Sequence, residues 1–550
     1  MDESSAQRSR ANVARNAGIV SLAVMASRVL GLVRDQVFAV LFGAGLQYDA
    51  FLTAFRVPNL LRDLLAEGAL SSAFVTTFTQ TLQSKGRAEA VRLSNRVATL
   101  SVIGITLISL LAWFFTSEIV RLLAPGFFAV PGKAELTISL TRIMIPFLLL
   151  IALAAQAMGM LNAFNVYAIP ALASAFFNIG SIVGGLFLGF LLGPAIGLSR
   201  IGGMAYGTVV GGILQLVVQW PSLSRCGVSY RPDLTFSDPG LRQISRLMGP
   251  AVIGTAAVQI NVFINTNFAS AIIDAATGAV TNGPVSWLNY AFRFMQFPIG
   301  VFGVAIATAT LPSLSRSTVN PDFTEFRQTL GHSLALVFLL CIPSAVGLAV
   351  LANPIVALVF QHGKFTAFDT AQTANALAVY ALGLAGYGAI KVLSPAFYAL
   401  NDARTPMLIS IGSIAVNYLM NSLLVGPFGH VGLACSTSAV ALVNFFLLAL
   451  FMRRRLGRLD GRHLRATVLR ICAASLPMAL TAWAISAAVA LLPLGGFLLH
   501  LVQVSAAISC ATLVFYLTCR LLRVEELTEA IDAIGGRFLR ALRKQKFTCR

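Results

Sequence analysis

Fourteen long apolar stretches, separated by short loops, constrain the fold of this chain more than any other feature. A helix needs about 20 apolar residues to cross the hydrocarbon core of a bilayer, where it satisfies its own backbone hydrogen bonds. Only 11% of the residues are charged, whereas soluble proteins carry about 25%. We therefore predict an all-α polytopic membrane protein. Its spans are expected at 16–42, 48–82, 91–116, 136–161, 168–192, 203–224, 243–272, 284–313, 327–352, 370–400, 406–426, 431–452, 465–492 and 497–520.

The basic residues predict the orientation of these spans. With the N-terminus in the cytoplasm, 29 of the 40 lysines and arginines fall in cytoplasmic segments and four in the opposite loops. Short loops rich in Lys and Arg stay on the cytoplasmic side of a membrane. Both termini are therefore expected in the cytoplasm. The net charge of +19 is then a topology signal and an attraction to anionic lipids, and it does not indicate nucleic-acid binding.

A weak internal repeat divides the spans into two halves. Ala-Phe-Arg at 54–56 recurs at 291–293, and Leu-Asn at 161–162 recurs at 400–401, each time ahead of a proline. Offsets of 236 to 239 residues between the matches predict two parallel six-helix lobes, a transporter plan with the substrate site between the halves. We expect an N-tail at 1–15, an N-lobe at 16–224, a cytoplasmic linker at 225–242, a C-lobe at 243–452, two extra helices at 465–520 and a basic amphipathic tail at 521–550.

Signatures of enzymes are absent from the sequence. It contains no G-x-x-x-x-G-K-[ST] phosphate loop, no H-E-x-x-H metal motif and no G-x-S-x-G nucleophile turn. The five histidines and seven cysteines are scattered, so they predict neither a metal site nor a redox site. We expect a protein that is not an enzyme and has no cofactor, with a coupling monovalent ion left open.

Ionisable residues inside apolar spans are the functional candidates, because each costs a few kcal/mol or more in a bilayer. Bases outnumber acids among them, and arginine presents a planar fork of donors that matches phosphate. The surplus predicts a substrate with a phosphate or diphosphate group. The bases are Arg28, Arg34, Arg56, Arg62, Arg142, Arg293 and Lys391, and the acids are Asp35, Asp63 and Glu67.

Structural explanations compete with this interpretation. The neighbouring pairs Arg34–Asp35 and Arg62–Asp63 would also serve to hold helices in register, and Arg142 would serve to reach the membrane interface. Amide side chains at membrane depth more often join helices than contact substrate. These amides are Asn59, Gln259, Asn261, Asn265 and Asn289.

Several motifs resemble the MurJ (MviN) family of lipid II flippases. They are Ser-Arg-Val-Leu-Gly-x-x-Arg-Asp at 27–35, Phe-Gly-Ala-Gly at 42–45, Asp-Ala-Phe at 49–51, Pro-Asn-Leu-Leu-Arg at 58–62, Ala-Glu-Gly-Ala at 66–69 and Gly-Lys-Phe-Thr at 363–366. The resemblance covers the first twelve spans. The sequence departs from the family at Phe292, where an acid is common, and at Thr76, where proline is usual.

This resemblance implies a fold like that of MATE transporters in the MOP superfamily, with a cationic cavity between two lobes and a groove for the polyprenyl tail along the last two spans. It implies that the diphosphate of lipid II, a peptidoglycan precursor, binds Arg28, Arg34, Asp35, Arg62 and Arg293. Further cavity candidates are Arg56, Asn59, Asp63, Glu67 and Lys391. We expect a monomer in the bacterial cytoplasmic (inner) membrane, acting with membrane lipids and with proteins of cell-wall synthesis or division.

Three other functions stay open on the sequence alone. A flippase for another polyprenyl-diphosphate-linked oligosaccharide would share the arginine surplus. A cation-coupled multidrug exporter should instead carry lone carboxylates, and a non-transporting scaffold for wall synthesis leaves the intramembrane arginines unexplained.

Overall fold

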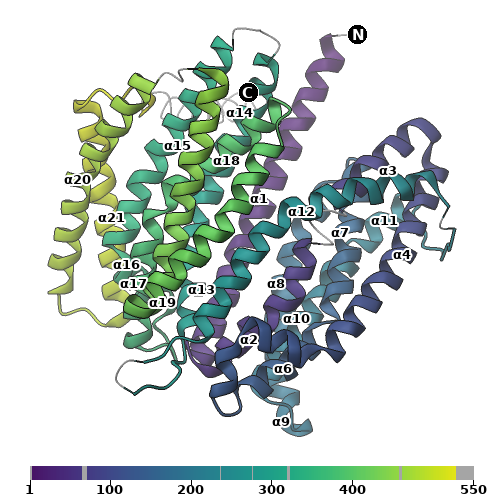
Figure 1. Cartoon of the computed structure of the whole chain (residues 1–550), viewed down its shortest axis with the longest axis horizontal. Helices are drawn as coiled ribbons and strands as arrows, with labels where there is room; N and C mark the ends of the chain where they lie inside the picture. Colours follow the sequence, from purple (N-terminus) through teal and green to yellow (C-terminus); the bar gives the residue numbers. More distant parts are fainter. Residues whose placement is uncertain are drawn as a thin grey trace, which may run out of the picture. The chain divides into compact units, whose positions relative to one another are not determined.

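The computed structural model describes residues 3–64, 71–235, 237–274, 277–318, 323–457 and 461–527. Within these ranges the secondary structure is helical apart from one isolated antiparallel bridge between Ile273 and Val280 (Figure 1). The prediction of an all-α protein is confirmed. The helices fall into two compact units, Met1–Ser286 and Trp287–Arg550.

The first unit holds the helices α1 (Glu3–Phe42), α2 (Leu46–Leu61), α3 (Ser71–Lys85), α4 (Arg87–Phe114), α5 (Thr116–Leu123), η2 (Pro125–Ala129), α6 (Lys133–Met144), α7 (Phe147–Ala163), α8 (Ala168–Leu186), η3 (Phe187–Leu192), α9 (Gly193–Ile196), α10 (Arg200–Val217), α11 (Trp220–Arg225) and α12 (Pro239–Ser270). The chain passes into the second unit within α13 (Pro284–Pro298). There it forms η4 (Ile299–Gly303), α14 (Val304–Ser317), α15 (Thr324–Val350), α16 (Ala352–Phe360), α17 (Ala367–Leu382), α18 (Leu384–Ala399), α19 (Arg404–Leu456), α20 (Gly461–Ala490) and α21 (Gly496–Leu521).

The positions of the predicted spans agree with these helices. Nine described helices are long and apolar enough to cross a membrane, and the bent pair α17–α18 makes a tenth candidate. One of the nine, α19, is broken at Gly429 and covers two predicted spans. The predicted spans 16–42, 48–82 and 243–272 coincide with α1, with α2 and α3, and with α12. The multi-pass architecture is therefore confirmed, while the total of fourteen stays a prediction.

Close backbone packing in the first unit depends on glycine. Helices α8 and α10 lie side by side (Figure 1). A side chain at Gly207 would overlap the backbone of Gly185, and one at Gly203 would overlap Gly189. Small residues allow such approach in membranes, where van der Waals contact drives helix association. Helix α1 also packs against α8.

Local geometry supports the internal repeat and corrects one of its matches. Asn165 and Asn401 both adopt the left-handed conformation just after a helix, and the next residue donates its N–H to a carbonyl five positions back in each case. These residues are 236 apart, as are Pro170 and Pro406. The equivalent of Asn401 is therefore Asn165, and the Leu-Asn match at offset 239 is out of register.

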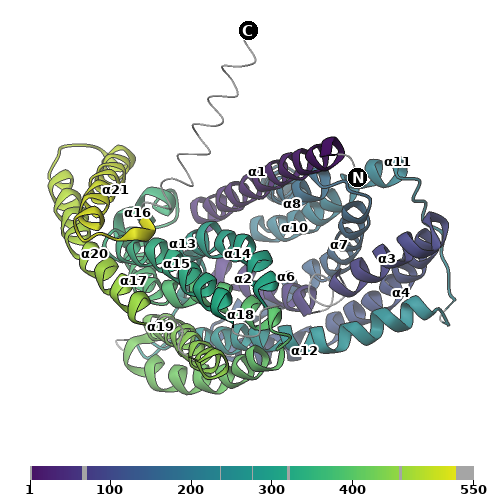
Figure 2. The same ribbon diagram turned by 90° about the horizontal axis from the view of Figure 1, so that it is seen from above.

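The two units divide at Ser286, whereas the predicted lobes divide at the 225–242 linker. Helix α12 therefore packs with the first unit, on α3, α4 and α5. Since this division follows packing and not repetition, the predicted lobe boundaries stay predictions. In the second unit α20 and α21 run as an antiparallel pair (Figure 2). The predicted amphipathic tail lies outside the described residues from position 528 onward.

Candidate functional site

The Arg34–Asp35 ion pair on α1 lies beside α8. Arg34 Nη2 is 3.3 Å from Asp35 Oδ1, and the guanidinium stands 5.7 Å from the ring centre of Phe177. Asn178 on α8 donates to the Ser27 carbonyl at 3.2 Å. The Asp35 side chain is 3% exposed and the Arg34 side chain 16%. Arg28, six residues earlier, is exposed. The acid is thus buried, while the arginine side chain keeps a small exposed fraction.

The Arg62–Asp63 ion pair lies at the end of α2, where the helix changes from α-helical to π-helical geometry. Residues 62–64 form a turn of π-helix four residues after Pro58, a local widening that often occurs at functional sites. Arg62 Nε and Nη2 both donate to Asp63 Oδ1, at 3.0 and 2.8 Å. The two side chains are 23% and 29% exposed. In the second unit, η4 is a π-helical turn directly after Pro298. A π-helical turn therefore occurs at the equivalent position in both repeats.

Helix α12 supplies partners that the sequence did not identify. Gln259 Nε2 donates to Asp63 Oδ2 at 3.0 Å, so one acid joins Gln259 to Arg62. About two turns further along α12, Thr266 accepts a hydrogen bond from Arg56 Nη1. Gln259 was expected to join helices more often than to contact substrate, and this bond does join two helices. The only signal in the sequence was a polar amide, Gln259, within an apolar helix. Its partner Asp63 lies 196 residues away in the sequence.

The remaining candidates are distributed as follows. Arg293 on α13 contacts Gln296 Oε1 at 3.5 Å, and Lys391 is exposed on α18, both in the second unit. A cage that joins Arg28, Arg34 and Arg293 therefore stays a prediction. Asn59 Oδ1 is buried without a hydrogen-bond partner among the described residues. Glu67 lies outside the described residues.

Arg142, also left open between two interpretations, stacks on an aromatic ring. Its guanidinium carbon lies 4.9 Å from the ring centre of Trp113 at the end of α4. Trp113 is 42% exposed, and aromatic rings of this kind anchor membrane proteins at the interface. This contact favours the structural interpretation, in which Arg142 reaches toward the membrane surface over an apolar ring.

A second network of charges was missed by sequence reasoning. Asp49 at the start of α2 and Lys133 at the start of α6 are both 0% exposed and lie 2.9 Å apart. Asp49 also accepts hydrogen bonds from the N–H groups of Gly283 and Ser286 and from the Ser286 hydroxyl, at 2.6 to 2.9 Å. Lys133 further donates to Asn282 at 2.8 Å. From the sequence, Lys133 was expected to be an ordinary basic residue of a loop. Its burial results from the tertiary packing.

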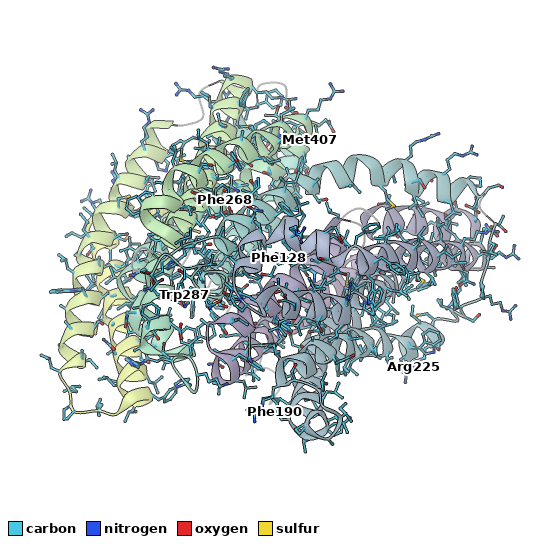
Figure 3. The ribbon with its side chains drawn as sticks, turned by 60° about the horizontal axis from the view of Figure 1, so that its bottom comes forward. Phe128, Phe190, Arg225, Phe268, Trp287 and Met407 are labelled. Atoms are coloured by element: carbon cyan, nitrogen blue, oxygen red, sulfur yellow. The ribbon has the colours of Figure 1, made fainter. Side chains whose placement is uncertain are left out.

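The arginines of α1 and α2 are suited to binding an anion. The described residues hold no group of three or more potential His, Cys, Asp or Glu ligands for a metal. Arginines held by neighbouring carboxylates keep a fixed direction, and each guanidinium has five N–H donors for partners. Such groups can bind a diphosphate by charge-assisted hydrogen bonds. Figure 3 shows the side chains on the ribbon, with Phe268 marking α12 beyond Thr266.

Comparisons with known proteins identify a single family. The family described as "Lipid II flippase MurJ" matches residues 38–503. The lipid II flippase MurJ of Burkholderia cenocepacia is 36% identical over 441 residues, which cover 79% of this chain and 83% of that protein.

Solved structures agree with this result. A lipid II flippase MurJ in an inward closed conformation matches with a TM-score of 0.75 and 26% identity, over 92% of this chain and 99% of its own. A MATE family transporter of the MOP superfamily in an inward-facing conformation matches with a TM-score of 0.66 and 17% identity, over 81% and 99% of the two chains. The second likeness shows a shared fold.

Proposed function

This chain belongs to the MurJ family of lipid II flippases, and from that premise we propose how its own residues bind the substrate. It is a transporter and not an enzyme, and it moves lipid II across a membrane for peptidoglycan synthesis. The diphosphate of lipid II binds the arginines of α1 and α2, namely Arg28, Arg34 and Arg62, together with Arg293 of the second unit. Asp35 and Asp63 are positioning residues, which hold the arginines and do not bind the anion.

The observation that carries this proposal is the geometry of Arg62. Asp63 binds Arg62 through one carboxylate oxygen and Gln259 through the other. The guanidinium is therefore held in direction while its side chain stays 23% exposed. A preorganised donor loses little freedom when it binds, so more of its interaction energy appears as affinity.

The membrane setting adds further proposals. Both termini lie in the cytoplasm, as the distribution of basic loops predicts, and the chain resides in the bacterial inner membrane as a monomer. Lipid II moves outward as the two lobes alternate in access. The tail of the substrate follows α20 and α21 in the lipid. Membrane potential drives the step, because each charge that crosses the field gains about 2.3 kcal/mol per 100 mV. A monovalent coupling ion and a wall-synthesis or division partner belong to the same proposal.

The experiment uses cells depleted of their own flippase and supplied with this chain or its Arg62→Ala variant. A lipid II-degrading enzyme is added outside the cells, and the fraction of precursor that it reaches is measured. We expect the native chain to expose the precursor and the variant to leave it shielded. Equal amounts of inserted protein, measured on membranes, are the condition for the comparison.

Two outcomes would overturn parts of the proposal. Equal exposure by the variant would remove Arg62 from the diphosphate site. If the inserted native chain left lipid II shielded while exporting another polyprenyl-diphosphate lipid, the substrate assignment would be wrong for this member. A multidrug exporter is disfavoured by the family match over residues 38–503 and by the paired state of the acids Asp35 and Asp63.

A further inference from the structure

A small pocket lies in the first unit, and its lining shares no residue with the arginine pairs. Helices α4, α7, α10 and α11 (Figure 1) and the linker segment that follows α11 form its walls. Its volume is about 160 Å³, close to that of an engineered cavity of roughly 150 Å³ that takes up benzene. A ligand of this size is a single six-membered ring with one or two small substituents.

The walls of this pocket favour a neutral, aromatic ligand. Among the described residues that line it, none is a lysine, arginine, histidine, aspartate or glutamate, so no charge there would offset the cost of burying an ionic group. The apolar part of the lining includes Val102, Leu153, Met160, Leu216 and Leu223. The Met160 thioether adds a preference for an aromatic ring, because sulfur makes favourable contacts with ring edges.

One polar atom of the lining residues lacks a partner. Gln156 is 3% exposed, and its Nε2 donates to the Ser94 carbonyl at 2.9 Å. That bond fixes the orientation of the amide, because only the nitrogen can donate to a carbonyl. Gln156 Oε1 is buried and accepts no hydrogen bond within the described residues. Since a buried acceptor without a partner is costly, a donor brought to this oxygen binds favourably.

The amide of Gln156 can turn this oxygen toward the pocket. The last torsion of a glutamine side chain is broad, and Gln156 Nε2 also lies 3.4 Å from Ser94 Oγ. After a small rotation the nitrogen still has one of the two Ser94 oxygens as its acceptor. The pocket therefore offers an apolar space and one acceptor, which match an apolar ring with one hydrogen-bond donor.

The pocket opens beside aromatic residues of the membrane interface. Trp220 and Tyr230 in its wall are 56% and 44% exposed, and aromatic side chains of this kind lie at the level of lipid head groups. The Tyr230 hydroxyl already lies 3.2 Å from Thr99 Oγ1, and Asn95 donates to the Ser229 carbonyl at 3.2 Å. Small rings with one polar group favour the same level, because one end is apolar and the other is wet. Such a ligand reaches the pocket from the interface.

We propose that this pocket binds a small, neutral aromatic alcohol, a phenol with one short apolar substituent. The ring lies among the apolar walls, and the hydroxyl donates to Gln156 Oε1. Val228 and Tyr230 of the linker segment form part of the wall, so a bound ring also packs against the linker. The linker leads to Asp238, which caps the start of α12. Occupancy of the pocket should therefore hold the linker in its packed position.

The test measures competition for the pocket in the full-length purified chain. The probe is para-fluorophenol, whose fluorine NMR line broadens on binding. The competitors are para-cresol and para-xylene, which have the same shape except that a methyl group replaces the hydroxyl. The ratio of their dissociation constants is compared between the native chain and Gln156→Met, which keeps the length of the side chain and removes the amide oxygen. Partition of the competitors into detergent is the same for both proteins and cancels.

We expect the ratio to shift about 10-fold toward para-cresol in the native chain, as one hydrogen bond to a buried acceptor predicts. A second measurement locates the bound ring. Hydrogen exchange of the peptide 226–235 should slow when para-cresol is added, since the Asp233 N–H bonds Thr99 Oγ1 at 3.2 Å in the packed linker. Ala98→Phe fills the pocket from α4, so it should abolish both the line broadening and the slower exchange.

A matched control lies at the start of α11. Gln219 is 0% exposed, and its Oε1 also lacks a partner among the described residues, but it does not line the pocket. Gln219→Met should keep the native ratio. Arg62→Ala should also keep it, which separates this pocket from the diphosphate site. Equal ratios in the native chain and Gln156→Met, or line broadening that Ala98→Phe leaves unchanged, would overturn the proposal.

Discussion

Two ion pairs of the first unit use the same chemistry in opposite ways. Asp49 and Lys133 are 0% exposed, and Asp49 accepts four hydrogen bonds from the lysine, two N–H groups and a hydroxyl. Arg62 and Asp63 are 23% and 29% exposed, and Asp63 also accepts a hydrogen bond from Gln259. In the first network, the Asp49 carboxylate already has its full set of hydrogen bonds and accepts no additional partner. The other network leaves both side chains partly exposed.

The difference teaches how to separate structural from functional charge in a membrane protein. A buried pair whose groups satisfy each other is costly to break, because removal of one partner leaves an isolated charge. A partly exposed pair contributes less to stability than a buried one, so its presence inside an apolar span needs another reason. The anchored arginine has such a reason in anion binding. Stability and transport should therefore respond to different substitutions.

The largest expected effect is on stability at the closed network. Lys133→Met leaves the Asp49 carboxylate buried without its base, so the free energy of unfolding should fall by about 3 kcal/mol or more. Thermal unfolding in detergent, followed by tryptophan fluorescence, measures the change. The double variant Asp49→Asn/Lys133→Met should be less destabilised than the single one. If the losses of the two single variants simply add in the double variant, the pair is not coupled.

Next in size is the effect of Arg62→Ala on transport. Loss of the guanidinium should reduce export of lipid II on the order of 100-fold, which corresponds to about 2–3 kcal/mol of binding. The free energy of unfolding should change by less than about 1 kcal/mol, because Asp63 stays partly exposed and bound to Gln259. Arg62→Lys should recover little, since lysine lacks the planar fork. If Arg62→Ala lowered stability as much as Lys133→Met, the distinction between a structural and a functional ion pair would be wrong.

A smaller effect is expected at the residue that anchors the acid. Gln259→Leu removes the hydrogen bond to Asp63 Oδ2, so export should fall by about 10-fold while the protein still inserts. Transport rate per inserted molecule is the measurement. Gln243→Leu is the matched control on the same helix, because Gln243 bonds the exposed Gln80 at 2.9 Å. If both substitutions lowered export equally, Gln259 would have no specific role.

The smallest effect is expected at an ion pair in a loop of the second unit. Burial raises the pKa of the Asp402 carboxyl, but hydrogen bonds from Thr405 and the charge of Arg455 outweigh it, so the pKa lies below its usual value. A lowered pKa stabilises the fold above the pKa of the unfolded state, about 3.9, and this stability is lost as pH falls through the folded value.

Arg455 is 41% exposed, so the contribution should stay below about 1 kcal/mol. We expect Asp402→Asn to be slightly less stable than the native chain at pH 7 and equal to it at the acid end of a pH series. Unfolding curves between pH 7 and pH 3 give the measurement. A constant difference across the series would mean that the charge of Asp402 is not responsible.

Much of the architecture could be predicted because it depends on local composition. Apolar runs identify helices by their length, and the positions of all fourteen predicted spans coincide with helices. The charged pairs of α1 and α2 were found for a related reason, since an ion in an apolar run is conspicuous wherever it lies. The position of Asn165 in the repeat was not found, because a left-handed residue after a helix is recognised only from its backbone.

What the sequence by itself determined is the membrane setting, the helical class, the excess of arginine in the spans and the family. These follow from composition and short motifs, which need no knowledge of distant neighbours. Only the tertiary structure decided that Gln259 holds Asp63 across 196 residues, that Lys133 is buried against Asp49, and that Gln156 leaves an acceptor open in a pocket. Burial and pairing depend on which side chains packing brings together, and segments far apart in the chain provide those partners.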